Sequence, residues 1–391
     1  QLQLIFILFV ANSAVSYFFS YKRSMIIADQ RRYIATIYRY TAYFLLNAAQ
    51  CAILIWTGNY IQYLLIQFLA TFLENLLVSK KAERLYPYPK EKTTEKLDAK
   101  TIKSISQNVG AMFFHKLGGI FVNSTDNIIL SKFIGIGAVG LYSNYELVLS
   151  ALSKVIYQIF EAFTASIGNM GATENSEKSR KIFYVLQFLD AWIFGVSSIC
   201  LWILFNPFIE VFFGKNMLLG RGTVGVIVAK YYITGMRKAV LTYRDAYGLY
   251  WQDRYKPLFE IVINIGASIA LVERWGISGV FFGTIISTVS TCFWVEPYIL
   301  FKYVFQTKSA EYFWRTAVYT GVSLAAGAAI TWISGSFQPE GIADFAVLCA
   351  FSFGMSNLLF LAIYFRRWEF QYIIRTGWSY FAGRRFIWMR K

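Results

Sequence analysis

The sequence predicts an all-α, polytopic membrane protein with about eleven transmembrane helices. Of its 391 residues, 57% are hydrophobic and only 15% are charged, whereas about a quarter of a soluble chain is charged. Apolar runs long enough to cross a bilayer recur along the chain, and basic residues gather in every second loop. Such a composition argues against a soluble enzyme, a nucleic-acid-binding domain and a disordered protein, because each of these needs more polar surface.

The apolar runs predict the individual helices, since one crossing uses about 20 apolar residues. The expected segments are 2–20, 38–57, 60–79, 105–130, 139–168, 182–205, 222–250, 257–272, 277–301, 313–334 and 343–365. The first run has no basic segment before it and no cleavage site after it, so it is expected to be a membrane helix and not a signal peptide. With eleven helices in the membrane, no soluble catalytic domain is left over, and the chain is not expected to be an enzyme.

The basic residues orient the helices. On one side of the membrane, the loops and the tail hold 28 Lys and Arg residues, whereas the opposite loops hold four. Because excess Lys and Arg mark the cytoplasmic side, we expect a multi-pass protein of the cell membrane with a cytoplasmic C-terminus. The net charge of +16 then reflects topology, and no nucleic-acid partner is expected.

An internal match suggests a repeat. SYKRSMIIADQRRY (20–33) and TYRDAYGLYWQDRY (242–255) align without a gap at an offset of 222 residues, and both follow a helix on the predicted cytoplasmic side. Chance similarity between two loops is the alternative. A true repeat equates helices one to three with helices seven to nine, and the chain is then expected to lack the first three helices of a larger bundle.

The predicted domain organisation follows from this repeat and from the polar stretches. It comprises the second half of an N-terminal bundle (1–79), a cytoplasmic basic linker (80–104), a six-helix C-terminal bundle (105–302), an appended helix pair (312–365) and a basic, aromatic cytoplasmic tail (366–391).

Polar side chains inside the predicted helices are the candidate substrate-binding residues. A charged side chain facing lipid is costly, so such residues are expected to line a water-filled cavity. Lys230, Arg237 and Arg244 are spaced by seven and so share one helix face. Snorkelling of Arg244, pairing of Arg237 with Glu260 or Asp190, and an internally satisfied core are the structural alternatives. The full set is Lys116, Asn123, Asp126, Lys154, Gln158, Glu161, Lys230, Thr234, Arg237 and Arg244.

This mixed lining is typical of a site for an anionic, hydroxyl-rich substrate. Cations bind phosphate, and amides and carboxylates hydrogen-bond sugars. The four cysteines lie singly in apolar runs, and His115 is the only histidine, so neither a metal site nor a cofactor is expected.

Three segments resemble the bacterial flippases for lipid-linked polysaccharide repeat units, which belong to the multidrug/oligosaccharidyl-lipid/polysaccharide (MOP) exporter superfamily. They are NSTDNIILSKFIGIGAVGLYSNYELVLSAL (123–152), GLYWQDRYKPLFEIVINIGASIAL (248–271) and WGISGVFFGTIIS (275–287). The resemblance implies a two-lobed MOP/MATE-like bundle around a central cavity.

The resemblance also implies a function and partners. The expected substrate is a polyprenyl-diphosphate-linked oligosaccharide, moved between leaflets by alternating access with a proton or sodium ion as the coupling ion. Membrane lipid, a polysaccharide polymerase and glycosyltransferases are the expected partners. The alternatives are a cation-coupled multidrug exporter of the same superfamily, and a membrane polymerase or glycosyltransferase. The basic stripe disfavours the exporter, and the short outer loops disfavour an enzyme.

Overall fold

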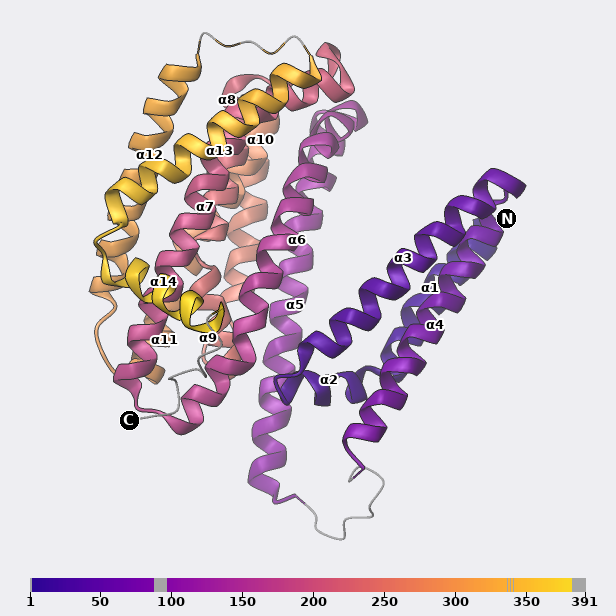
Figure 1. Cartoon of the computed structure of the whole chain (residues 1–391). Coiled ribbons are helices and arrows are strands. Elements are labelled where there is room, and N and C mark those ends of the chain that lie inside the picture. Colours follow the sequence, from indigo (N-terminus) through magenta and orange to yellow (C-terminus); the bar gives the residue numbers. More distant parts are fainter. Residues whose placement is uncertain (1, 88–96, 336, 338, 340, 382–391) are drawn as a thin grey trace. The chain divides into compact units, whose positions relative to one another are not determined.

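The computed structural model describes residues 2–87, 97–335, 337, 339 and 341–381, and these residues form helices and turns (Figure 1). The chain divides into two compact units, Gln1–Asp98 and Ala99–Lys391. The boundary falls inside the predicted linker 80–104. This linker is shorter than predicted, because helices continue to Leu85 and resume at Ala99.

Unit 1 is a short helical assembly with a broken first helix. Its helices are α1 (Leu2–Phe18), α2 (Ser20–Ala28), α3 (Arg32–Thr57) and α4 (Tyr60–Leu85). The α1–α2 pair bends by 47°, and the predicted loop after α1 is therefore largely helical. Gly58, at a φ of 60°, ends α3, and the side chain of Asn59 accepts a hydrogen bond from the Ile61 amide at the start of α4. This turn joins α3 and α4 in a hairpin.

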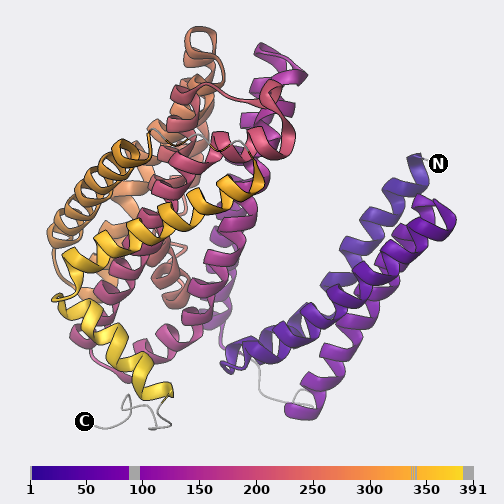
Figure 2. The same cartoon turned by 45° about the horizontal axis from the view of Figure 1, so that its top comes forward.

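Unit 2 is a larger bundle built around α7. Its helices are α5 (Ala99–Phe133), α6 (Ile136–Thr173), α7 (Ser176–Phe213), α8 (Arg221–Gly235), α9 (Lys238–Tyr247), α10 (Lys256–Ser287), α11 (Phe293–Leu300), α12 (Ala310–Ser334), α13 (Ile342–Tyr364) and α14 (Trp368–Phe381). Short turns of other helix types lie at Lys215–Met217 (η2), Thr288–Cys292 (η3) and Phe301–Phe305 (η4). The appended helices α12, α13 and α14 pack on α7 (Figure 1, Figure 2). Side chains from Trp378 onward in the predicted tail lie outside the described residues.

Several helices are long and apolar enough to cross a membrane. Six meet this description among the described residues, and a seventh does if the bent α1–α2 pair is one span. A multi-pass membrane protein is therefore supported, but eleven spans are not confirmed. The six helices are Tyr60–Leu85, Ile136–Thr173, Ser176–Phe213, Lys256–Phe305, Ala310–Ser334 and Ile342–Tyr364.

The helix from Lys256 to Phe305 folds back on itself. At Gly276 the backbone has a φ of 55° and a ψ of −132°, which glycine adopts without strain. Ser268 donates to the Val280 carbonyl at 3.1 Å, so residues on either side of the turn meet. A Cβ on Gly283 would lie 2.5 Å from the Ser268 amide nitrogen, which shows how closely the two limbs pack. The two limbs, which run from Lys256 to Phe305 and are here together called the α10 hairpin, match the two segments predicted at 257–272 and 277–301.

The predicted helix 222–250 is wrong as one continuous element. The structure contains α8 and α9 with a break at Met236 and Arg237. At this point a Cβ on Gly235 would clash with the ring of Phe194 at 2.1 Å. The buried carboxylate of Asp190 accepts a hydrogen bond from the Ala239 amide at 3.1 Å. Asp190 thus satisfies an amide that the first turn of α9 leaves without a partner in its own helix.

Candidate functional site: a basic pocket and two buried ion networks

All ten predicted site residues belong to unit 2, but the structure distributes them over separate places. The stripe of Lys230, Arg237 and Arg244 is interrupted by the break between α8 and α9. Each of these three cations has a different acidic partner. Two of the ten residues line a common pocket, and two others form an ion pair with each other.

Two predicted cations line one pocket, here called the basic pocket. It lies between α5 and the turn that follows α9, and it has a volume of about 550 Å³. Lys116 is exposed and has no carboxylate partner among the described residues. The polar residues that line the pocket are His115, Lys116, Ser124, Arg244, Asp245 and Tyr250. Two cations and one carboxylate therefore face the same space.

The Arg244 side of the basic pocket is held in place by its neighbours. Its guanidinium donates to Asp245 Oδ1 at 3.0 and 3.2 Å and lies 5.2 Å from the ring centroid of Tyr250. The Tyr250 hydroxyl also donates to Asp245 Oδ1, at 2.9 Å. The Tyr250 hydroxyl is therefore a hydrogen-bond donor in the wall of the pocket.

His115 connects α5 to the turn before α10. Its Nε2 lies 2.7 Å from Asp253 Oδ1, and its ring packs edge-on against Tyr250. The other oxygen of Asp253 lies 4.0 Å from Arg244 Nη1. This pair fixes the two walls that carry Lys116 and Arg244. In the sequence, His115 stands out only as the single histidine.

Arg237 is part of a buried ion network and does not face the basic pocket. Its Nε and Nη2 donate to the two oxygens of Glu296 at 2.9 and 2.7 Å. Lys256 donates to the same carboxylate at 2.5 Å and lies 4.0 Å from Glu260. Arg237 is therefore ion-paired, but with Glu296 and not with the predicted Glu260 or Asp190.

Lys230 and Asp126, both predicted to bind substrate, bind each other. Lys230 Nζ lies 2.8 Å from Asp126 Oδ2 and 4.7 Å from the ring centroid of Phe281. The Thr284 hydroxyl lies 3.2 Å from both oxygens of the same carboxylate. Asp126 is only 2% exposed. This pair joins α5, α8 and the second limb of the α10 hairpin.

The remaining candidates lie elsewhere in unit 2. On α6, Lys154, Gln158 and Glu161 are exposed, and Thr234 on α8 is half-buried. These four are not among the described residues that line the basic pocket. The side chain of Asn123 lies outside the described part of the structure.

Sequence reasoning named Asp126 but missed three other acidic partners, Asp245, Asp253 and Glu296. Glu296 is the only carboxylate within the apolar run 277–301. An isolated acid in a predicted membrane helix indicates a paired or functional group, so this signal could have identified it. The contact of Thr284 with Asp126 depends on the hairpin, and that of Asp253 with His115 depends on the turn after α9; periodicity predicts neither.

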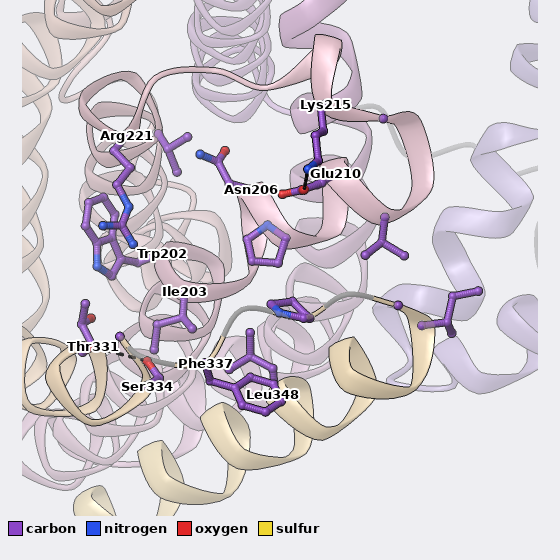
Figure 3. Close-up of a pocket in the computed structure, with 18 residues that line it drawn as sticks. Trp202, Ile203, Asn206, Glu210, Lys215, Arg221, Thr331, Ser334, Phe337 and Leu348 are labelled. Atoms are coloured by element: carbon purple, nitrogen blue, oxygen red, sulfur yellow. Dashed lines mark hydrogen bonds and ion pairs between the residues drawn. The ribbon is translucent and has the colours of Figure 1, made fainter.

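A second, larger cavity of about 990 Å³ lies where α7 and α12 end and where α8 and α13 begin (Figure 3). Trp202 and Arg221 line it, together with Glu210 and Lys215, whose charged atoms are 3.4 Å apart. None of the ten predicted site residues is among the described residues that line this cavity.

Comparison of the chain with family models, with curated proteins and with solved structures finds no match.

Proposed function

We propose that this protein is a transporter of the MOP superfamily that flips polyprenyl-diphosphate-linked oligosaccharides across the bacterial cytoplasmic membrane by alternating access. The observation that carries the proposal is the basic pocket. In it the ammonium of Lys116, which has no carboxylate partner in the described part of the chain, and the guanidinium of Arg244 face one space. An exposed cation in a segment that the sequence predicts to lie in the membrane favours an anionic ligand.

The two cations suit a diphosphate. A guanidinium binds phosphate oxygens through a planar fork, and an ammonium binds them as a point charge. Lys116 and Arg244 come from opposite walls of the pocket, so each can bind one phosphate group. Asp245, Ser124 and Tyr250 offer acceptors and donors for sugar hydroxyls.

The apolar part of the pocket suits a lipid tail. Met112 and Ile120 lie about one turn on either side of Lys116 and line the same pocket. Phe113 and Phe114 are exposed on the same helix. A prenyl chain can therefore leave the pocket along apolar side chains while its diphosphate stays on the cations.

A proton or sodium ion is the proposed coupling ion, and a polysaccharide polymerase and glycosyltransferases are the proposed partners.

Binding of a short polyprenyl diphosphate to the detergent-purified chain tests this proposal. Because a hydrogen bond to a charged group contributes about 1.5–3 kcal/mol, Lys116→Ala and Arg244→Ala should each weaken binding about 10- to 100-fold. Lys132→Ala is the matched control, since this exposed lysine lies at the far end of α5. It should bind as the wild type does.

The uncharged polyprenol of the same length separates the diphosphate from the tail. Equal affinity for the polyprenol and the diphosphate would contradict the proposal. Binding of lipophilic cations in place of the diphosphate would favour the multidrug exporter.

A further inference from the structure

The two units share an order of elements that reaches beyond the matching loops. Unit 1 contains the bent α1–α2 pair, a turn with Gln30 at a φ of 59°, and the α3–α4 hairpin closed at Gly58. Unit 2 contains the broken α8–α9 pair, a turn with Gly248 at a φ of 65°, and the α10 hairpin closed at Gly276. Each unit thus consists, at least in part, of a broken helix, a turn with a left-handed residue and a helical hairpin.

The offset of 222 residues also holds in the last helix of each set. It aligns Glu74 of α4 with Glu296 of α11, and Lys80 with Lys302. The first match lies at the end of the broken helix, and this second match lies about 50 residues further on without any gap. At the same offset Gly58 aligns with Val280 and not with Gly276, and Arg23 aligns with Asp245 and not with Arg237, so the register matches the two glutamates but not their partners.

The two aligned glutamates have the same kind of partner. Glu74 is 9% exposed and accepts a hydrogen bond from Arg23 of α2 at 2.5 Å. Glu296 is 3% exposed and binds Arg237 at the start of α9. In each unit, a buried carboxylate in the second limb of the hairpin therefore binds an arginine of the broken helix, Arg23 within α2 and Arg237 at the break before α9. Such carboxylates are costly inside an apolar bundle unless they are paired.

We infer that Glu74 and Glu296 are positioning residues, each of which anchors the broken helix of its own unit during transport. Rocking mechanisms require each repeat to move as one body. A broken helix can flex at its break, and the arginine–glutamate pair prevents this by tying the second segment to the hairpin. This inference rests on the proposed function for its transport role, and on the structure alone for the anchoring.

Two substitutions test the anchoring without any substrate. Glu74→Gln should raise amide hydrogen exchange at least tenfold in α2 and leave α9 unchanged, and Glu296→Gln should do the reverse. Glu83→Gln is the matched control on α4, because its pair with Lys22 is partly exposed to solvent and is expected to contribute little. Unchanged exchange in α2 of the Glu74→Gln variant would overturn the anchoring.

Transport in proteoliposomes tests the positioning role. Both glutamine variants should lower the maximal flipping rate at least tenfold, with the half-saturating substrate concentration within twofold of the wild-type value. The charge exchange Arg23→Glu with Glu74→Arg should restore a substantial part of the rate. A wild-type maximal flipping rate in the Glu74→Gln variant would overturn the inference. A variant in which only the half-saturating substrate concentration changes would also overturn it. A wild-type protein that fails to flip the substrate would instead contradict the proposed function. The hydrogen-exchange measurement on Glu74→Gln would still decide whether the pair anchors the helix.

Discussion

The guanidinium of Arg237 binds both oxygens of the Glu296 carboxylate, 59 residues further along the chain. Both side chains are almost fully buried. The pair joins the break between α8 and α9 to the second limb of the α10 hairpin. Arg237 therefore has a structural partner at the position where the sequence alone predicted a substrate cation.

Removing Arg237 should destabilise the protein. In Arg237→Ala the buried network loses one of its two cations, and breaking a buried pair costs about 3–5 kcal/mol. The thermal unfolding midpoint in detergent should fall clearly. Lys181→Ala is the control, because its pair with Glu177 is exposed on both sides and should contribute at most about 1 kcal/mol. Equal midpoints for Arg237→Ala and Lys181→Ala would show that the buried pair is not structural.

Lys230 and Asp126 should be energetically coupled. Lys230→Met leaves a buried carboxylate without its cation, and Asp126→Asn leaves the ammonium without its anion, so each single variant should unfold at a lower temperature. The double variant should be more stable than the sum of the single effects predicts, by about 0.5–3 kcal/mol. Additive effects would mean that the 2.8 Å contact contributes nothing to stability.

The α10 hairpin should not tolerate a methyl group at Gly283. Its Cβ would lie 2.5 Å from the Ser268 amide nitrogen, and overpacking of this kind costs about 1–3 kcal/mol. Gly283→Ala should therefore lower the unfolding midpoint. Gly266→Ala is the matched control in the first limb, where a Cβ meets nothing within 4 Å. This control should be neutral or slightly stabilising, and a similar loss in both variants would argue against close packing of the limbs.

The predicted orientation can be tested with single cysteines in a cysteine-free background. Asn59 and Lys215 are exposed at turns predicted to lie outside the cell, and Lys181 is exposed near the predicted cytoplasmic start of α7. An impermeant thiol reagent should label the first two positions in intact cells and leave Lys181→Cys unlabelled until the cells are opened. Labelling of Lys181→Cys in intact cells would mean that the chain has the opposite orientation to the predicted one.

The sequence predicted the helices better than their interruptions. Apolar runs identify where helices form, because burial or lipid contact of about 20 residues dominates the local energetics. The break at Met236 was not predictable from this pattern, because it depends on two residues of a distant helix. Phe194 packs against Gly235, and Asp190 satisfies the amide of Ala239.

The candidate site was predicted only in part, for a related physical reason. An intramembrane charge indicates that a partner is needed, and helical periodicity shows which charges share a face. Neither signal distinguishes a cation that lines a pocket from one that is held in a buried ion pair. Lys116 and Arg244 line a pocket, whereas Arg237 and Lys230 bind Glu296 and Asp126. Only the packing of α5, α8 and the α10 hairpin separates these two outcomes.

Flipping of a fluorescent polyprenyl-diphosphate-linked oligosaccharide in proteoliposomes tests the central claim most directly. The lipid is distributed over both leaflets, and a glycosidase added outside cleaves the sugar only where it is exposed. With wild-type protein, cleavage should proceed beyond the outer-leaflet fraction toward completion, and with Lys116→Ala it should be markedly slower. Cleavage by wild-type vesicles that stops at the level of protein-free vesicles would contradict the claim.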